Sequence, residues 1–134
     1  MSAAWNGAGN ATFVAGDVAE RLAAVGRADI VVLNPPRKGC AKAVLDQTAA
    51  LGPRVIAYLS CNPETLLRDL AILHQRGYRT RGLTPFDMLP HTPHLEALAI
   101  LDATIPAAVA DQGTREGEKT ARTGPAQLAL RWTP

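Results

Sequence analysis

Apolar residues follow two different spacings along the first hundred residues of the chain. Continuous apolar runs at residues 29–33 and 54–60 are typical of strands that are buried on both faces of a sheet. Less regular apolar stretches at residues 11–15, 78–86 and 95–101 predict three further strands. The pattern therefore predicts a sheet of at least five strands.

Three stretches between these strands have the spacing of amphipathic helices. Two of them span residues 17–24 and 43–51. The third has the clearest signals, because Asn62 suits the N-cap, Pro63 suits the first helical position and Gly77 suits the end. Its buried stripe consists of three leucines: Leu66, Leu70 and Leu73.

The alternation of strands and helices predicts an α/β fold with a mostly parallel sheet. From about residue 103 the apolar pattern is replaced by Pro, Gly, Thr and charged residues. We therefore predict a flexible tail at residues 103–134.

The composition narrows the class of protein. Apolar residues make up 47% of the chain and aromatic residues only 4%, so the core is expected to be aliphatic. A net charge of +2 permits an RNA partner but does not by itself indicate one. The chain has no apolar run of the roughly 20 residues that a membrane helix needs, and no secretory signal. We expect a soluble intracellular protein.

Candidate chemistry lies where the predicted strands end. Asp17, Asn34 and Cys61 each follow a predicted strand or its terminal glycine. Ligands of open α/β sheets bind outside the carboxyl ends of the strands. We therefore expect these three side chains to converge on one site.

The two cysteines differ in their surroundings. Cys61 directly precedes a predicted helix N-terminus, whose free amides and dipole stabilise a thiolate nucleophile. A buried cysteine that acts as a small apolar residue is an equally good interpretation of its position. Cys40 follows Gly39 in a loop and has no such helix signal, so the apolar interpretation is favoured for it.

The segment at residues 91–96 has two interpretations. His91, His94 and Glu96 could bind a metal, but Pro93 separates the histidines and prevents the helical spacing of zinc enzymes. The metal site is disfavoured, and none is expected. Glu96 instead opens a strand and could act as a proton acceptor, or could simply be solvated.

Several motifs together resemble the RNA 5-methyluridine (uracil-5) methyltransferases, which use S-adenosyl-L-methionine. The segment SCNPETL at residues 60–66, followed by RDL at 68–70, is similar to their nucleophile segment. LNPPRKGC at residues 33–40 and DMLPHTPHLE at 87–96 are similar to two further family motifs. FVAGD at residues 13–17 is similar to the strand and acidic turn that precede them.

The resemblance implies the Rossmann-like sheet of a class I methyltransferase over residues 1–102, and a covalent mechanism. Cys61 would add to carbon 6 of a flipped-out uracil in tRNA or rRNA, and Glu96 would later remove the proton from carbon 5. Asp17 and Asn34 match family positions that contact S-adenosyl-L-methionine. The family usually has Asp where this chain has Asn34, so that one cofactor or substrate contact would lack its charge. The resemblance also implies a cytoplasmic enzyme.

The resemblance covers only the C-terminal part of the family's catalytic domain. The Gly-rich loop after the family's first strand and the acidic residue after its second have no counterpart in this chain. We therefore expect a sheet that lacks its first strands, and a fragment that is inactive alone and needs the missing N-terminal half. One alternative is a non-catalytic remnant that binds RNA or a partner chain. Another, ranked low, is an amino-group methyltransferase, because Asn-Pro-Pro also serves such enzymes.

Overall fold

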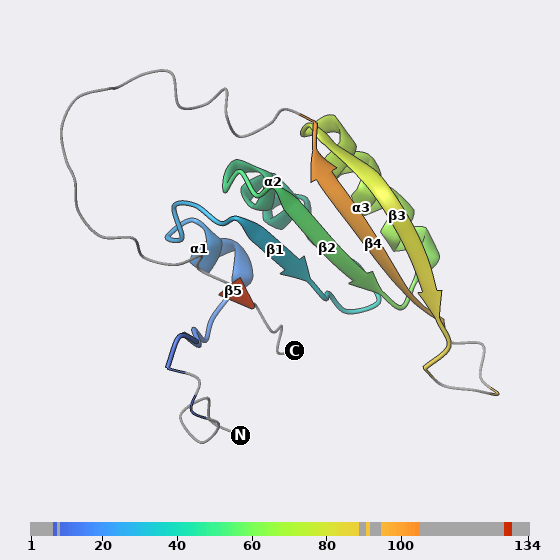
Figure 1. The fold of residues 1–134 in the computed structure, drawn as a ribbon, viewed down its shortest axis with the longest axis horizontal. Coiled ribbons are helices and arrows are strands. Elements are labelled where there is room, and N and C mark those ends of the chain that lie inside the picture. The colour runs from blue at the N-terminus through green and yellow to red at the C-terminus, as the bar shows by residue number, and fades with distance from the viewer. Residues whose placement is uncertain (1–6, 8, 89–90, 92–94, 105–127, 130–134) are drawn as a thin grey trace.

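The structure is a computed structural model with an α/β fold (Figure 1), and it describes residues 7, 9–88, 91, 95–104 and 128–129. The elements follow one another along the chain as α1 (Val18–Leu22), β1 (Ile30–Leu33), α2 (Lys42–Ala50), β2 (Val55–Ser60), α3 (Pro63–Gln75), β3 (Tyr78–Phe86), β4 (Glu96–Ala103) and β5 (Leu128–Ala129).

The sheet is mixed, and the prediction of a mostly parallel sheet is wrong in this respect. Its strand order is β3-β4-β2-β1-β5. β1 is parallel to β2 and to β5, whereas β4 is antiparallel to both β2 and β3. A parallel pair needs a crossover of about a dozen residues or more. Residues 87–95 are too few for one, so β3 and β4 form a hairpin.

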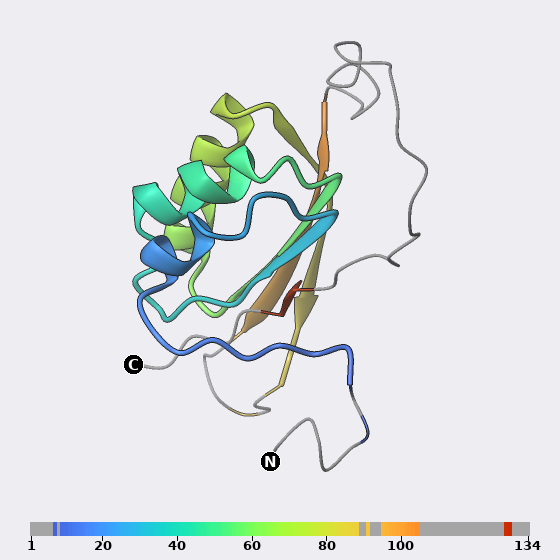
Figure 2. The same cartoon turned by 90° about the vertical axis from the view of Figure 1, so that its left-hand side faces the viewer.

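The three helices cover one face of the sheet, and Figure 2 shows this arrangement from the side. Side chains of β1 consequently alternate between buried and exposed. Ile30 is 37% exposed and Val32 is 44% exposed, so the prediction that this strand is buried on both faces is wrong. The reason is that no described element covers the second face. The core lies between the helices and the first face, and its largest fully buried side chains include Tyr58, Leu22, Leu45, Ile56, Leu73 and Leu101.

The predicted strand at residues 11–15 is not a strand in the structure. The segment has no regular secondary structure, and the Phe13 side chain is 73% exposed. A strand persists only when a neighbour shares its backbone hydrogen bonds, and none of the described strands pairs with this segment. The helix that follows is confirmed but shorter, with Leu22 buried and with Val18 and Val25 packed against the core.

Helix α3 agrees closely with its sequence signals. The Asn62 side chain accepts a hydrogen bond from the Glu64 amide at 3.0 Å, and Pro63 occupies the first helical position. Gly77 follows the helix with φ 88°, a conformation that glycine adopts without strain. The three predicted leucines are all buried. The predicted bounds of the next strand, residues 78–86, are also confirmed.

The predicted tail lies mostly outside the described residues, and so do residues 92–94 of the histidine segment. Two residues of the tail form β5, in which Leu128 pairs with Val31. Ala103, the first residue of the predicted tail, ends β4 instead. Among the described residues no helix is both long and apolar enough to cross a membrane.

Candidate active site

Asn34 and Cys61 lie at the same edge of the sheet. Asn34 directly follows β1, and Cys61 directly follows β2. The two strands are parallel, and their register pairs Leu33 with Tyr58, so β2 continues two residues beyond the end of β1. The Asn34 side chain is exposed and Cys61 is half-buried. The structure therefore brings two of the three strand-end residues to one edge.

Glu96 reaches this edge from the opposite direction. It is the first residue of β4, which runs antiparallel to β2 with Ser60 paired to Ala97. The paired register ends there, and Cys61 directly follows Ser60 while Glu96 directly precedes Ala97. A thiol and a half-buried carboxylate therefore lie at the same end of β2 and β4.

Asp17 has a defined structural role. It is the N-cap of α1, and its Oδ1 atom accepts hydrogen bonds from the amides of Ala19 at 2.9 Å and Glu20 at 3.3 Å. Its side chain is exposed. The described contacts of this carboxylate are with the first turn of α1, so they do not themselves join Asp17 to Asn34 or Cys61.

The turn that carries Cys61 is held by its two neighbours. The Ser60 hydroxyl donates to the Asn62 carbonyl at 3.0 Å and accepts from the Asn62 amide at 3.1 Å. Asn62 also caps α3 through the amide of Glu64. Because both flanking residues are bound in this way, the backbone of Cys61 is fixed between the end of β2 and the start of α3.

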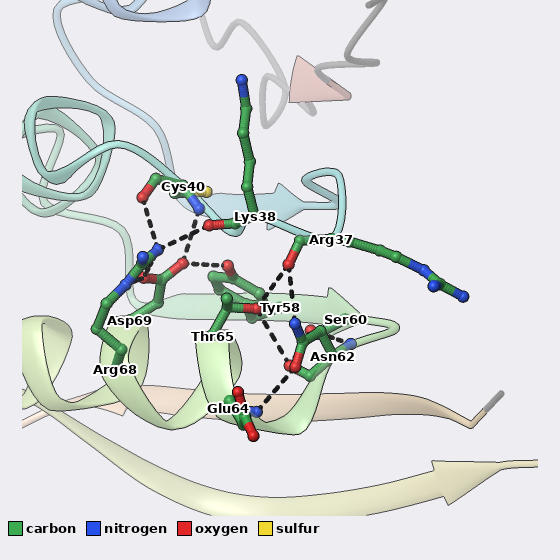
Figure 3. A network of polar contacts seen from close by, with 10 residues as sticks. All are labelled: Arg37, Lys38, Cys40, Tyr58, Ser60, Asn62, Glu64, Thr65, Arg68 and Asp69. Atoms are coloured by element: carbon green, nitrogen blue, oxygen red, sulfur yellow. Dashed lines mark hydrogen bonds and ion pairs between the residues drawn. The ribbon is translucent and has the colours of Figure 1, made fainter. Parts of the chain in front are cut away.

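The first turns of α3 also bind the loop that follows β1. The Arg37 carbonyl accepts hydrogen bonds from Asn62 Nδ2 at 3.2 Å and from the Thr65 hydroxyl at 3.0 Å. Figure 3 shows that the side chains of Arg37 and Lys38 point away from this network, while their backbone carbonyls face it. The loop is therefore held by its backbone, and its two cationic side chains project outward.

A buried carboxylate of α3 binds the next residues of the same loop (Figure 3). Asp69 on α3 has a fully buried side chain, and its Oδ2 atom accepts from the Tyr58 hydroxyl at 2.5 Å and from the Cys40 amide at 2.7 Å. Its Oδ1 atom forms an ion pair with Arg68 at 2.7 Å. The Arg68 guanidinium in turn donates to the carbonyls of Lys38 at 3.0 Å and Cys40 at 3.2 Å.

Burial and these contacts change the acid–base behaviour of the network. Burial raises the pKa of the Cys40 thiol to about 11, a hydrogen bond with Tyr58 opposes this shift, and the Asp69 charge adds to it. The pKa of Tyr58 is raised first by burial and then by its hydrogen bond to Asp69. Cys40 therefore remains a neutral thiol that packs against the core, as its apolar interpretation predicted.

Gly39 allows the loop to approach α3 this closely. Its φ is +75°, and a Cβ atom at this position would lie 2.6 Å from both Arg68 Nη2 and Asp69 Oδ2. In the sequence, Arg68 and Asp69 were noted only as part of a family motif, and neither they nor Tyr58 were given a role in this site. One signal was present, because Asp69 interrupts the apolar stripe of α3 between Leu66 and Leu73, where a charged residue needs a partner.

The histidine segment contributes no metal site that the structure describes. Within the described ranges, no three His, Cys, Asp or Glu side chains come together as metal ligands. His91 is described and has φ 70°, whereas His94 is outside the described residues.

Comparison with known proteins decides the family. The family model described as tRNA (Uracil-5-)-methyltransferase matches residues 21–104. The chain belongs to this family. The match includes Asn34, Cys61 and Glu96, and it leaves Asp17 outside. This match confirms the family resemblance that was inferred from the nucleophile segment and the two further motifs.

Relatives and a solved structure agree with this assignment. An uncharacterized RNA methyltransferase of Geobacter sulfurreducens is 50% identical over 101 residues, which are 72% of this chain and 20% of the relative. A second one, from Halalkalibacterium halodurans, is 43% identical over 101 residues, with 72% and 22% coverage.

The solved structure is the tRNA (uracil-54, C5)-methyltransferase of Pyrococcus abyssi in complex with S-adenosyl-L-homocysteine. It has a TM-score of 0.52 and 42% identity over 57% of this chain and 19% of that one. The chain thus spans about a fifth of the length of the proteins it matches.

Proposed function

We propose that this chain carries the catalytic residues of an RNA uracil-5 methyltransferase, which methylates carbon 5 of a uridine in tRNA or rRNA. The observation that carries the proposal is the placement of Cys61 and Glu96 at one edge of the sheet, within a chain of this family. A thiol and a carboxylate are the two groups that the chemistry requires, since carbon 5 of uracil is a poor nucleophile on its own.

The two residues act in sequence on the same ring. The Cys61 thiolate forms a bond to carbon 6 of the uracil, and the electron pair of the carbon 5–carbon 6 double bond makes carbon 5 nucleophilic. S-adenosyl-L-methionine, when bound, supplies the methyl group that carbon 5 takes up. Glu96 then removes the proton from carbon 5, the double bond re-forms, and the Cys61 thiolate leaves.

The described residues provide part of a cofactor site. Asn34 is exposed at the carboxyl end of β1 and offers both a donor and an acceptor to S-adenosyl-L-methionine. Asp17 binds the first turn of α1 through Oδ1, so its Oδ2 atom is the one that would accept a hydrogen bond from the cofactor. Because residue 34 is asparagine and not aspartate, the contact of Asn34 with the cofactor would consist of amide hydrogen bonds without a charge.

We further propose that the chain acts together with additional polypeptide. Ile30 and Val32 are exposed on the face opposite the helices, and Leu98 and Ile100 alternate with the buried residues of β4. Sheets with parallel strands and apolar residues on both faces are normally covered on both. A polypeptide that covers this face would also supply the rest of the cofactor site. The alternative is that the chain binds RNA or this polypeptide but catalyses no reaction, and is then a binding module.

A covalent trap tests the proposal. RNA that contains 5-fluorouridine is mixed with S-adenosyl-L-methionine and the chain, alone and supplemented with the N-terminal part of the Geobacter sulfurreducens relative. Fluorine at carbon 5 cannot leave as a proton does, so we expect a stable RNA–protein adduct on a denaturing gel. Cys61→Ala should abolish the adduct, and Cys40→Ala, the matched control, should retain it.

A second variant separates the two catalytic roles. Glu96→Gln cannot remove the carbon 5 proton, so it should accumulate the adduct on ordinary uridine RNA and release little methylated product. An adduct that survives Cys61→Ala, or that is absent from the supplemented wild-type chain, would refute the catalytic proposal. If the supplemented wild-type chain forms no adduct but the two polypeptides associate tightly, the chain is a binding module.

A further inference from the structure

We propose that Asp69 is a positioning residue of this site, which holds the loop between β1 and α2 against α3 and so keeps Asn34 beside Cys61. The proposal rests on the proposed function, because it assigns a purpose to the geometry of that site. Asp69 does not reach the edge of the sheet where Asn34 and Cys61 lie. It acts through the loop backbone at Lys38 and Cys40.

The two carboxylate oxygens of Asp69 have different partners. Oδ2 accepts from the Tyr58 hydroxyl and the Cys40 amide, and Oδ1 accepts from Arg68 Nε at 2.8 Å. Arg68 extends the contact to two further loop carbonyls. Burying a carboxylate costs free energy, and even a paired one often contributes little net stability compared with an apolar residue. What such a residue provides in return is one defined geometry for the groups that it binds.

The loop and the Cys61 turn are bound to the same helix. Asn62 and Thr65 in the first turn of α3 hold the Arg37 carbonyl, while Asp69 and its neighbour hold Cys40 one turn later (Figure 3). Cys61 directly precedes this first turn. The part of the loop from Arg37 to Cys40 therefore cannot move relative to Cys61 without breaking these hydrogen bonds. A misplacement of about 1 Å at a reacting centre can lower a rate by roughly 100-fold.

The same contact keeps the second thiol of the chain away from the substrate. Cys40 packs partly against the core, and its amide is bound by Asp69. If the loop detached from α3, Cys40 would become accessible near the edge where Cys61 must react. Reactivity of Cys40 is therefore a direct measure of whether the loop is in place.

Asp69→Asn is the main test, because asparagine has one side-chain oxygen where aspartate has two. That oxygen can serve Arg68, or it can serve Tyr58 and Cys40, but not both sets. Tyr58→Phe is a milder second variant. Its matched control is Tyr78→Phe, which removes another buried tyrosine hydroxyl, one that donates to the Pro53 carbonyl at 3.0 Å.

The first measurement is made on the chain itself, by iodoacetamide labelling with peptide mass spectrometry and by hydrogen exchange of the Cys40 amide. We expect Asp69→Asn to increase Cys40 labelling at least tenfold, Tyr58→Phe to increase it less, and Tyr78→Phe to leave it unchanged. Unchanged labelling and exchange in Asp69→Asn would overturn the proposal.

The second measurement is methyl transfer in the supplemented enzyme. We expect kcat to fall at least tenfold in Asp69→Asn, with the KM for RNA changed less than threefold, and to fall less in Tyr58→Phe. The network would be merely structural if Tyr58→Phe and Tyr78→Phe had equal kcat values. The same would follow if Asp69→Asn showed increased Cys40 labelling but an unchanged kcat. A wild-type enzyme without turnover would refute the proposed function, while Cys40 labelling would still decide whether Asp69 holds the loop.

Discussion

Helix α3 takes part in two Asp–Arg ion pairs in different environments. In its middle, the buried Asp69 binds the adjacent Arg68, which reaches the loop at Lys38. Near its end, Arg76 binds Asp46 of α2 at 2.8 Å, and both side chains are partly exposed. Arg68 reaches the Lys38 carbonyl across 30 residues, and Arg76 reaches Asp46 across the same separation. Of the two carboxylates, however, only Asp69 is buried, and it accepts further hydrogen bonds from Tyr58 and Cys40.

The difference between the two ion pairs indicates which part of α3 is held in a fixed position. Hydrogen bonds from Arg76 and, second to it, from Lys42 lower the pKa of Asp46. Solvent and salt, however, screen such exposed ion pairs. The Asp69 contact is shielded from solvent, and its loss leaves buried donors without acceptors. We therefore expect the end of α3 near Cys61 to be rigid and its other end to tolerate substitution.

Asp69→Ala should have the largest effect on stability. The substitution leaves the Tyr58 hydroxyl and the Cys40 amide without an acceptor, and we expect it to lower the free energy of unfolding by about 3 kcal/mol. Urea denaturation followed by circular dichroism measures this. Asp46→Ala is the exposed control and should shift the midpoint far less. Equal shifts would contradict the contrast between the two contacts.

Gly39→Ala should have the next largest effect. Alanine is strained at φ +75°, and its Cβ would lie 2.6 Å from Arg68 Nη2 and Asp69 Oδ2. We expect a loss of about 2 kcal/mol. Gly52→Ala is a matched control, because Gly52 has φ +64° and nothing within 4 Å of the added Cβ. Thermal unfolding should show a clearly smaller loss for Gly52→Ala, since it measures the backbone strain alone.

The pH dependence of stability should show a smaller effect of the same network. The folded-state pKa of Cys40 is raised to about 11 from 9.0. The neutral thiol is therefore favoured by folding, and its contribution is complete below pH 9 and lost as the pH rises toward 11. We expect this loss to reach about 1–2 kcal/mol. Unfolding titrations at pH 8 to 11 measure it, and Cys40→Ala should flatten the curve while Cys61→Ala retains it.

Local signals were sufficient where the neighbouring residues decide the structure. The cap at Asn62, the proline after it and Gly77 mark both ends of α3, because capping and φ preferences act within a few residues. They were insufficient at residues 11–15, where an apolar run pairs with none of the described strands. They also missed the antiparallel β4, since strand direction depends on the chain connection and not on apolar content.

The sequence allowed the residues of the candidate site to be predicted, but not how they are arranged in space. Asn34 and Cys61 follow apolar strands, and Glu96 precedes one, so sequence position alone singles them out. The sequence does not show that Glu96 comes to the same edge as Cys61. That follows from the antiparallel register of β2 and β4, which no local pattern encodes.

By itself, the sequence determined the helices and strands of residues 17–103 to within a few positions, the family of the chain and the residues proposed for its chemistry. It could do so because caps, apolar spacing and motifs are local properties. Only the tertiary structure decided that β4 runs antiparallel to β2, that no described element covers one face of the sheet, and that Asp69 binds a loop some thirty residues earlier. These contacts join distant segments, so their energies depend on how the chain packs and not on any stretch of sequence alone.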